Sequence, residues 1–126
     1  MRPLMIIAAA SLLGSCARPV SPPHSDLAAT VAGRTAGPAT NCISTNPAEN
    51  LRVLDGQNLA YGNGRTIYVN HLEAACPAIG EFNTVIVEAG LGGQYCRGDR
   101  IRGLEPGAII PGPSCNLGQW VPYRKQ

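Results

Sequence analysis

The chain has 126 residues, of which 44% are hydrophobic and 14% charged, and its formal net charge is +2 at pH 7. So small a basic excess, with only 5% aromatic residues, argues against a nucleic-acid-binding protein. The length allows one small domain together with N-terminal targeting signals.

Residues 1–15 predict a secretory signal peptide. Arg2 supplies a positive charge, and Leu4 to Leu13 form a mostly apolar run that is too short to span a bilayer. The motif Leu13-Gly14-Ser15-Cys16 resembles a bacterial lipobox, which implies that Cys16 is acylated and becomes the first mature residue. Ala17 then favours the outer membrane by the sorting habits of lipoproteins. The alternative is ordinary signal cleavage near Ala17, with Cys16 lost or left as a free thiol.

Residues 16–40 predict the acylated cysteine followed by a flexible tether. Small residues and prolines dominate this segment, and large apolar side chains are nearly absent. Too little surface is available for burial to offset the entropy of ordering. His24 and Asp26 are therefore expected to be solvated linker residues.

Residues 41–126 predict one domain stapled by two disulfides, because Cys42, Cys76, Cys96 and Cys115 remain once Cys16 is set aside. A domain of this size has a marginal core, so covalent bridges are common. Four cysteines allow three pairings, and sequence does not choose among them. A nested pairing, Cys42 with Cys115 and Cys76 with Cys96, is favoured because it joins the two ends of the domain. The spacing disfavours a zinc site.

Alternating apolar residues between turn signals predict an all-β fold, a small antiparallel barrel or sandwich. Strands are expected at 51–54, 59–61, 67–69, 82–87, 94–97, 100–104 and 118–123. Asn63-Gly64 favours a hairpin with a type I′ turn. The 82–87 segment has the pattern of a central strand, whereas Pro122 places the last strand at an edge. Only His71 to Ala75 has local helical character, for one turn at most.

The sequence lacks the motifs of nucleotide-binding, zinc-peptidase and α/β-hydrolase proteins, and neither a metal nor a cofactor is expected. His71 and Glu73 stand two residues apart and form a candidate acid–base pair, with Asp99 as another carboxylate. The simpler interpretation makes His71 a partly exposed residue at a strand end and Glu73 a solvated loop carboxylate.

The candidate contact residues of a binding surface are aromatic or cationic. They are Tyr61, Tyr68, Arg100, Arg102 and Trp120. The arginines, with the neighbouring Arg97, suit an anionic group. They also fit the solvent face of a strand, as the aromatic residues fit a small β core.

The domain resembles a family of small bacterial envelope proteins known as a domain of unknown function. The similarity covers most of residues 41–123. The motifs that carry it are Cys42-Ile43, Val53-Leu54-Asp55, Tyr68 with Leu72, Cys76-Pro77, Tyr95-Cys96 with Asp99, and Cys115-Asn116-Leu117-Gly118. The resemblance implies export and a shared four-cysteine domain but no activity, and a lipobox is not a fixed feature of the family.

Together these features predict an envelope lipoprotein that faces the periplasm and acts as a non-enzymatic binding or structural module. Its expected partners are the membrane, through the lipid anchor, and an envelope protein or glycan. The first alternative is a small hydrolase or lyase of envelope glycans that uses His71 with Glu73 or Asp99. The second is an inhibitor that presents the proline-rich loop at 106–113 to a periplasmic enzyme.

Overall fold

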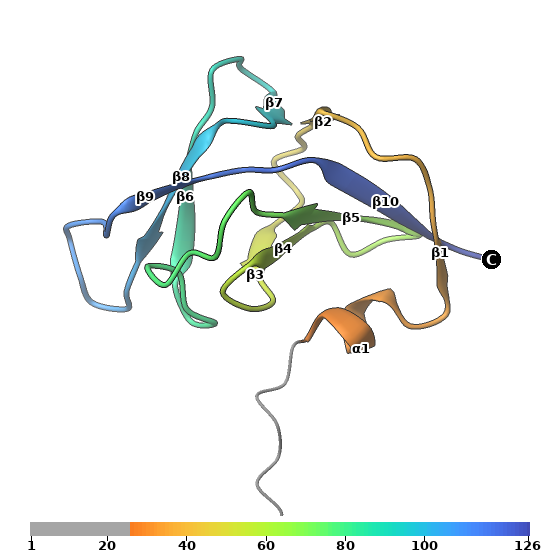
Figure 1. Ribbon diagram of the computed structural model, residues 1–126, viewed down its shortest axis with the longest axis horizontal. Helices are drawn as coiled ribbons and strands as arrows, with labels where there is room; N and C mark the ends of the chain where they lie inside the picture. Colours follow the sequence, from red (N-terminus) through yellow and green to blue (C-terminus); the bar gives the residue numbers. More distant parts are fainter. Residues whose placement is uncertain (1–25) are drawn as a thin grey trace, which may run out of the picture.

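The computed structural model describes residues 26–126 (Figure 1). The predicted signal peptide, Cys16 and the first part of the predicted tether lie outside these residues. The described chain forms one short helix and ten short strands. They are α1 (Leu27–Val31), β1 (Arg34–Ala36), β2 (Cys42–Ser44), β3 (Leu51–Val53), β4 (Asn58–Tyr61), β5 (Thr66–His71), β6 (Thr84–Glu88), β7 (Gln94–Cys96), β8 (Arg100–Leu104), β9 (Ser114–Asn116) and β10 (Trp120–Lys125). The predicted all-β class is confirmed.

The strands form three antiparallel sheets. The largest has the order β1-β10-β5-β4-β3, a second pairs β2 with β7, and a third has the order β6-β8-β9. The sheets do not close into a barrel, and the arrangement is sandwich-like (Figure 1).

The five-stranded sheet is covered on both faces, because successive side chains of a strand point to opposite sides. Leu59 and Tyr61 on β4 join the main core, where Ile101 of β8 and Leu117 are also buried. Ile67 and Val69 on β5 join a second, smaller cluster on the other face. The main core therefore lies where the three sheets meet.

Helix α1 packs on that second cluster through Leu27 and Val31. Strand β1 then extends the sheet by pairing with β10, from Arg34 opposite Lys125 to Ala36 opposite Tyr123. The folded body thus begins well before residue 41, where the sequence placed the boundary between tether and domain. Leu27 and Val31 of α1 stand four residues apart, the spacing that brings two side chains to one helix face.

The disulfides join Cys42 to Cys96 and Cys76 to Cys115. The prediction of two bridges is confirmed, but the nested pairing is wrong. Cys42 and Cys96 lie directly opposite each other in the β2–β7 ladder, so strand pairing decides this bridge. The second bridge joins Cys76, in the segment that follows β5, to Cys115 of β9, and Cys76 is fully buried. The bridges are typical of an oxidising, exported location.

The hairpin predicted around Asn63-Gly64 is confirmed, but its turn type is wrong. A type I′ turn needs positive φ at both central residues. In the structure the only positive φ of this loop belongs to Gly62, at 84°. Four residues, 62–65, connect β4 to β5, and Tyr61 pairs with Tyr68 beyond them.

Two strand positions and one helical turn also differ from expectation. The strand expected from residue 82 begins at Thr84, and β6 is an edge strand with β8 at the centre of its sheet. Strand β10 lies between β1 and β5, although it contains Pro122. His71 ends β5 and is followed by irregular chain, not by a helical turn.

Pro122 is tolerated inside the sheet because of the register of β10. The N–H and C=O of Trp120 bond to Thr40, and the carbonyl of Pro122 accepts from the N–H of Gly37. The missing N–H of Pro122 therefore faces the β1 side, between the Thr40 bridge and the end of β1 at Ala36. At this point the neighbouring chain leaves the ladder, so the loss of a donor costs little.

Candidate functional site

Two of the five candidate contact residues are interior. The hydroxyl of Tyr61 accepts from the N–H of Asn46 at 2.6 Å and donates to its carbonyl at 3.0 Å, and its ring meets Tyr95 edge to face. Trp120 is 0% exposed in the main core, and its Nε1 has no partner among residues 26–126. Both side chains build the core and are not available to a partner.

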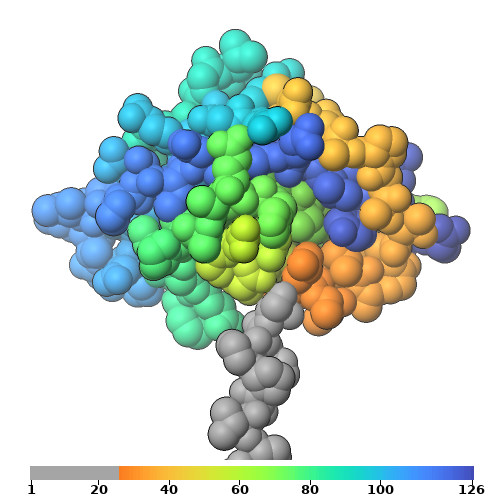
Figure 2. All heavy atoms as spheres, in the orientation of Figure 1, coloured from red at the N-terminus to blue at the C-terminus, as the bar shows by residue number. Residues whose placement is uncertain are grey.

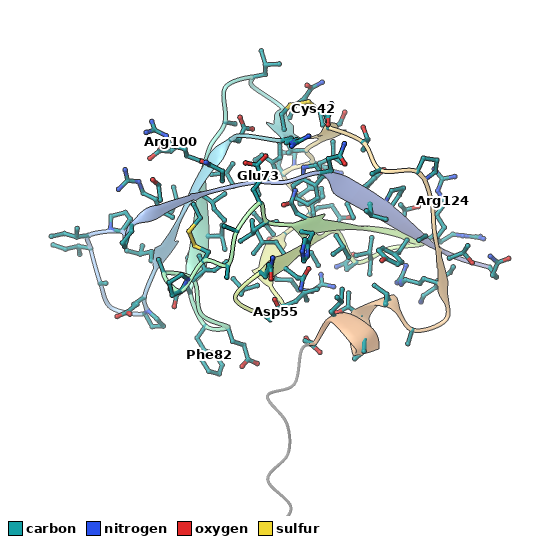
Figure 3. The ribbon with its side chains drawn as sticks, in the orientation of Figure 1. Cys42, Asp55, Glu73, Phe82, Arg100 and Arg124 are labelled. Atoms are coloured by element: carbon teal, nitrogen blue, oxygen red, sulfur yellow. A yellow bond between two sulfur atoms is a disulfide. The ribbon has the colours of Figure 1, made fainter. Side chains whose placement is uncertain are left out.

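The other three candidates lie nearer the surface. Tyr68 is partly buried against the main core. Arg100 and Arg102 both bind Glu88 across the β6–β8 pair, at 3.1 and 2.9 Å. Figure 3 shows Arg100 on the outside of this sheet. Because one carboxylate serves both cations, the cluster carries a net charge of only +1, which makes a weak anion site.

His71 and Glu73 lie at the rim of one depression of about 340 Å³, next to the end of β5 and the start of β10. Arg97, which follows β7, lines the same depression and donates from Nε to Glu73 at 3.0 Å. Asp99 does not take part. Its carboxylate accepts from the N–H groups of Cys96 and Gly90 and so holds the turn before β8.

A chain of hydrogen bonds fixes the imidazole of His71. The Nδ2 of Asn58 donates to both carboxylate oxygens of Asp55, at 3.0 and 2.9 Å, which leaves Oδ1 facing His71. The Nδ1 of His71 lies 2.8 Å from that oxygen. An amide oxygen only accepts, so Nδ1 carries the proton and, in the neutral ring, Nε2 is an acceptor. Among residues 26–126 this nitrogen has no hydrogen-bond partner.

The chain after β8 forms an exposed loop at one end of the molecule. In Figures 1 and 2 this β8–β9 loop, residues 105–113, projects at the left, opposite β1 and the C-terminus. Ile109 and Ile110 near its tip are 91% and 79% exposed. Together with the segment around Gly80 and Asn83 it borders a hollow of about 280 Å³. Phe82, also 79% exposed, points away from the body in Figure 3.

The backbone of the β8–β9 loop is held in place. The N–H of Ala108 donates to Glu105 at 3.0 Å, and that of Gly112 donates to Gly103 at 2.9 Å. Prolines at 106, 111 and 113 fix further dihedrals. The exposed isoleucines are therefore presented on a constrained loop.

The sequence indicated His71, Glu73 and the loop at 106–113, but it did not indicate Asn58 or Asp55 as partners of His71. A usable signal was present. Asp55 and Asn58 flank Gly56-Gln57, and an aspartate that begins a turn often bonds the backbone N–H two residues on. Here Asp55 accepts from the N–H of Gln57 and from that of Asn58, both at 2.8 Å.

Within residues 26–126 no group of three His, Cys, Asp or Glu side chains could hold a metal ion. No helix in this part of the chain has the length and apolar character needed to cross a membrane.

Comparisons with protein-family models, with curated proteins and with solved structures give no match.

Proposed function

We propose that the protein is an exported lipoprotein of the cell envelope that acts as a non-enzymatic binding module, and that the β8–β9 loop is its contact with another envelope protein. The observation that carries this proposal is the exposure of Ile109 and Ile110 on a constrained loop. Large apolar side chains gathered at one tip mark an interaction site more often than scattered ones do.

A protein cleft suits this loop better than a lipid surface. The loop is convex, so its partner must be concave, and the hollow beside it can receive a side chain in return. Glu105 is the only charged residue from 104 to 116. Membrane-binding surfaces add Lys or Arg next to their apolar residues, and this loop has neither.

The constrained backbone of the β8–β9 loop favours high affinity for a partner, because a loop that is already ordered loses little entropy on binding. Two buried isoleucines contribute about 3 kcal/mol or more in transfer free energy, which corresponds to more than 100-fold in affinity. The same geometry supports the second candidate, an inhibitor whose loop occupies the cleft of a periplasmic enzyme. The resemblance to the four-cysteine envelope family is compatible with either function.

The loop is tested with the double variant Ile109→Ser/Ile110→Ser. Crosslinking in the native envelope, followed by affinity purification and mass spectrometry, is expected to recover one dominant partner with the native chain and at least 100-fold less with the variant. Leu91→Ser is the matched control, because Leu91 is 61% exposed but lies in the β6–β7 connection. Equal recovery from the loop variant and the native chain would refute the proposal. If the partner is an enzyme whose activity the native chain lowers, the inhibitor is established.

The anchor is tested with Cys16→Ser. Mass spectrometry of the native chain is expected to show a diacylglyceryl group on Cys16 and a mature N-terminus at this residue. The variant is expected to leave the membrane fraction, since removal of the acyl chains removes most of the membrane affinity. An unmodified Cys16, or a mature chain that begins after it, contradicts the lipoprotein part of the proposal and leaves the loop contact standing.

A further inference from the structure

A second site lies away from the β8–β9 loop, in the depression that contains His71. Its polar lining comes from separate parts of the chain: Gln57 before β4, His71 at the end of β5, Glu73 two residues beyond it, Arg97 after β7, and Gln119 before β10. The volume, about 340 Å³, is at the lower end of the range for small-molecule sites, about 300 to 1,000 Å³. The depression is therefore sized for a small ligand or for one short unit of a longer one.

The lining offers donors and acceptors in a fixed arrangement. Gln119 donates from Nε2 to Asn41 at 3.1 Å, which leaves its Oε1 as an acceptor. Arg97 uses Nε for Glu73, so its two terminal nitrogens remain as donors. The Nε2 of neutral His71 adds an acceptor whose direction is set by Asn58 and Asp55.

The hydrogen bond between Asn58 and His71 is not needed to form the turn at Asp55. Asp55 already stabilises its turn through the backbone N–H groups of Gln57 and Asn58. The Oδ1 of Asn58 in addition accepts a hydrogen bond from the Nδ1 of His71, and this bond holds a surface imidazole in one tautomer and one orientation. An acceptor fixed in this way binds a donor with little loss of entropy.

The charges and the strands restrict the ligand class. Glu73 and Arg97 neutralise each other, so the depression has no net charge to attract a phosphate or a carboxylate. The adjoining strands β5 and β10 are both interior, so an extended peptide finds no free strand edge there. A neutral ligand with many groups that both donate and accept hydrogen bonds fits best, and hydroxyls are such groups.

We propose that this depression binds a neutral saccharide, with the Nε2 of His71 accepting a hydrogen bond from a sugar hydroxyl or acetamido N–H. Arg97 and Gln57 donate to sugar oxygens, and Gln119 accepts from a second hydroxyl. The site is independent of the β8–β9 loop, so the protein can hold an envelope glycan and a protein partner at the same time.

The probes are tri-N-acetylchitotriose and maltotriose, added at millimolar concentration to the mature ¹⁵N-labelled chain. At least one of them is expected to shift the amide resonances of Gln57, His71 and Gln119. His71→Asn keeps a donor toward Asn58 but removes the acceptor at Nε2, and is expected to bind about tenfold more weakly. His71→Gln places an amide oxygen near the position of Nε2 and is expected to restore part of the binding.

Two controls keep the result specific. The loop variant Ile109→Ser/Ile110→Ser is expected to bind the saccharide like the native chain, which separates this site from the proposed protein contact. Thermal unfolding shows whether each His71 variant is folded. No shift with either saccharide, shifts confined to other regions, or native affinity in a folded His71→Asn variant overturns the proposal.

Discussion

Replacement of both Cys76 and Cys115 by alanine is expected to lower the free energy of unfolding by about 4 kcal/mol. The two residues are 39 apart in sequence, and in the chain-entropy model a bridge of this span restricts the unfolded chain by about that amount. Domains of this size have a total stability of about 5 to 15 kcal/mol, so a large share is lost. Denaturation in urea without reductant measures the change.

The bridge is also a packing element, because Cys76 is fully buried in the main core beside Ile79. Alanine in both positions fills less of this space than the two sulfurs do. Mass spectrometry after alkylation is the control, since it must show that Cys42 and Cys96 are still joined in the variant. An unfolding midpoint equal to that of the native chain would contradict the pairing of Cys76 with Cys115.

Gly118→Ala is expected to lower the free energy of unfolding by about 3 kcal/mol or more, at the upper end of the range for overpacking in a close-packed interior. A Cβ at this position collides with the backbone carbonyl oxygen of His71, and no flexible side chain can move aside. The backbone of Gly118 is also held by the side chain of Asn70, which is 0% exposed. Its Nδ2 donates to the Gly118 carbonyl and its Oδ1 accepts from the N–H, both at 2.8 Å.

Gly64→Ala is the matched control, because a Cβ at Gly64 meets nothing within 4 Å and its φ is not positive. Its stability is expected to equal or slightly exceed that of the native chain. Guanidinium unfolding of both variants measures the difference. A Gly118→Ala variant as stable as Gly64→Ala would show that the His71 and Gly118 backbones do not approach as described.

The hairpin of β4 and β5 was predictable because its signal is local. Alternating apolar residues and a turn-forming segment lie within fourteen residues, from Asn58 to His71. Strand β1 gave no such signal, since Arg34–Ala36 is short and polar and is ordered by its pairing with β10. Helix α1 is likewise only five residues long and depends on the sheet beneath it.

The disulfide pairing was not predictable because it follows from strands that are distant in sequence. Cys42 meets Cys96 only because β2 pairs with β7, a contact across 54 residues. The same limit applies to the saccharide site. The spacing of His71 and Glu73 is visible in the sequence, but the approach of Asn58 and Arg97 requires the β4–β5 register and the β2–β7 pair.

The two bridges interlock along the chain, since Cys76 lies between Cys42 and Cys96 while Cys115 lies beyond them. Every peptide bond from Cys42 to Cys115 is therefore enclosed by at least one bridge. A protease that cuts the protruding β8–β9 loop, or any other single bond in this range, releases no fragment. After such a nick a disulfide still joins the two pieces covalently, so the damaged molecule keeps its parts together.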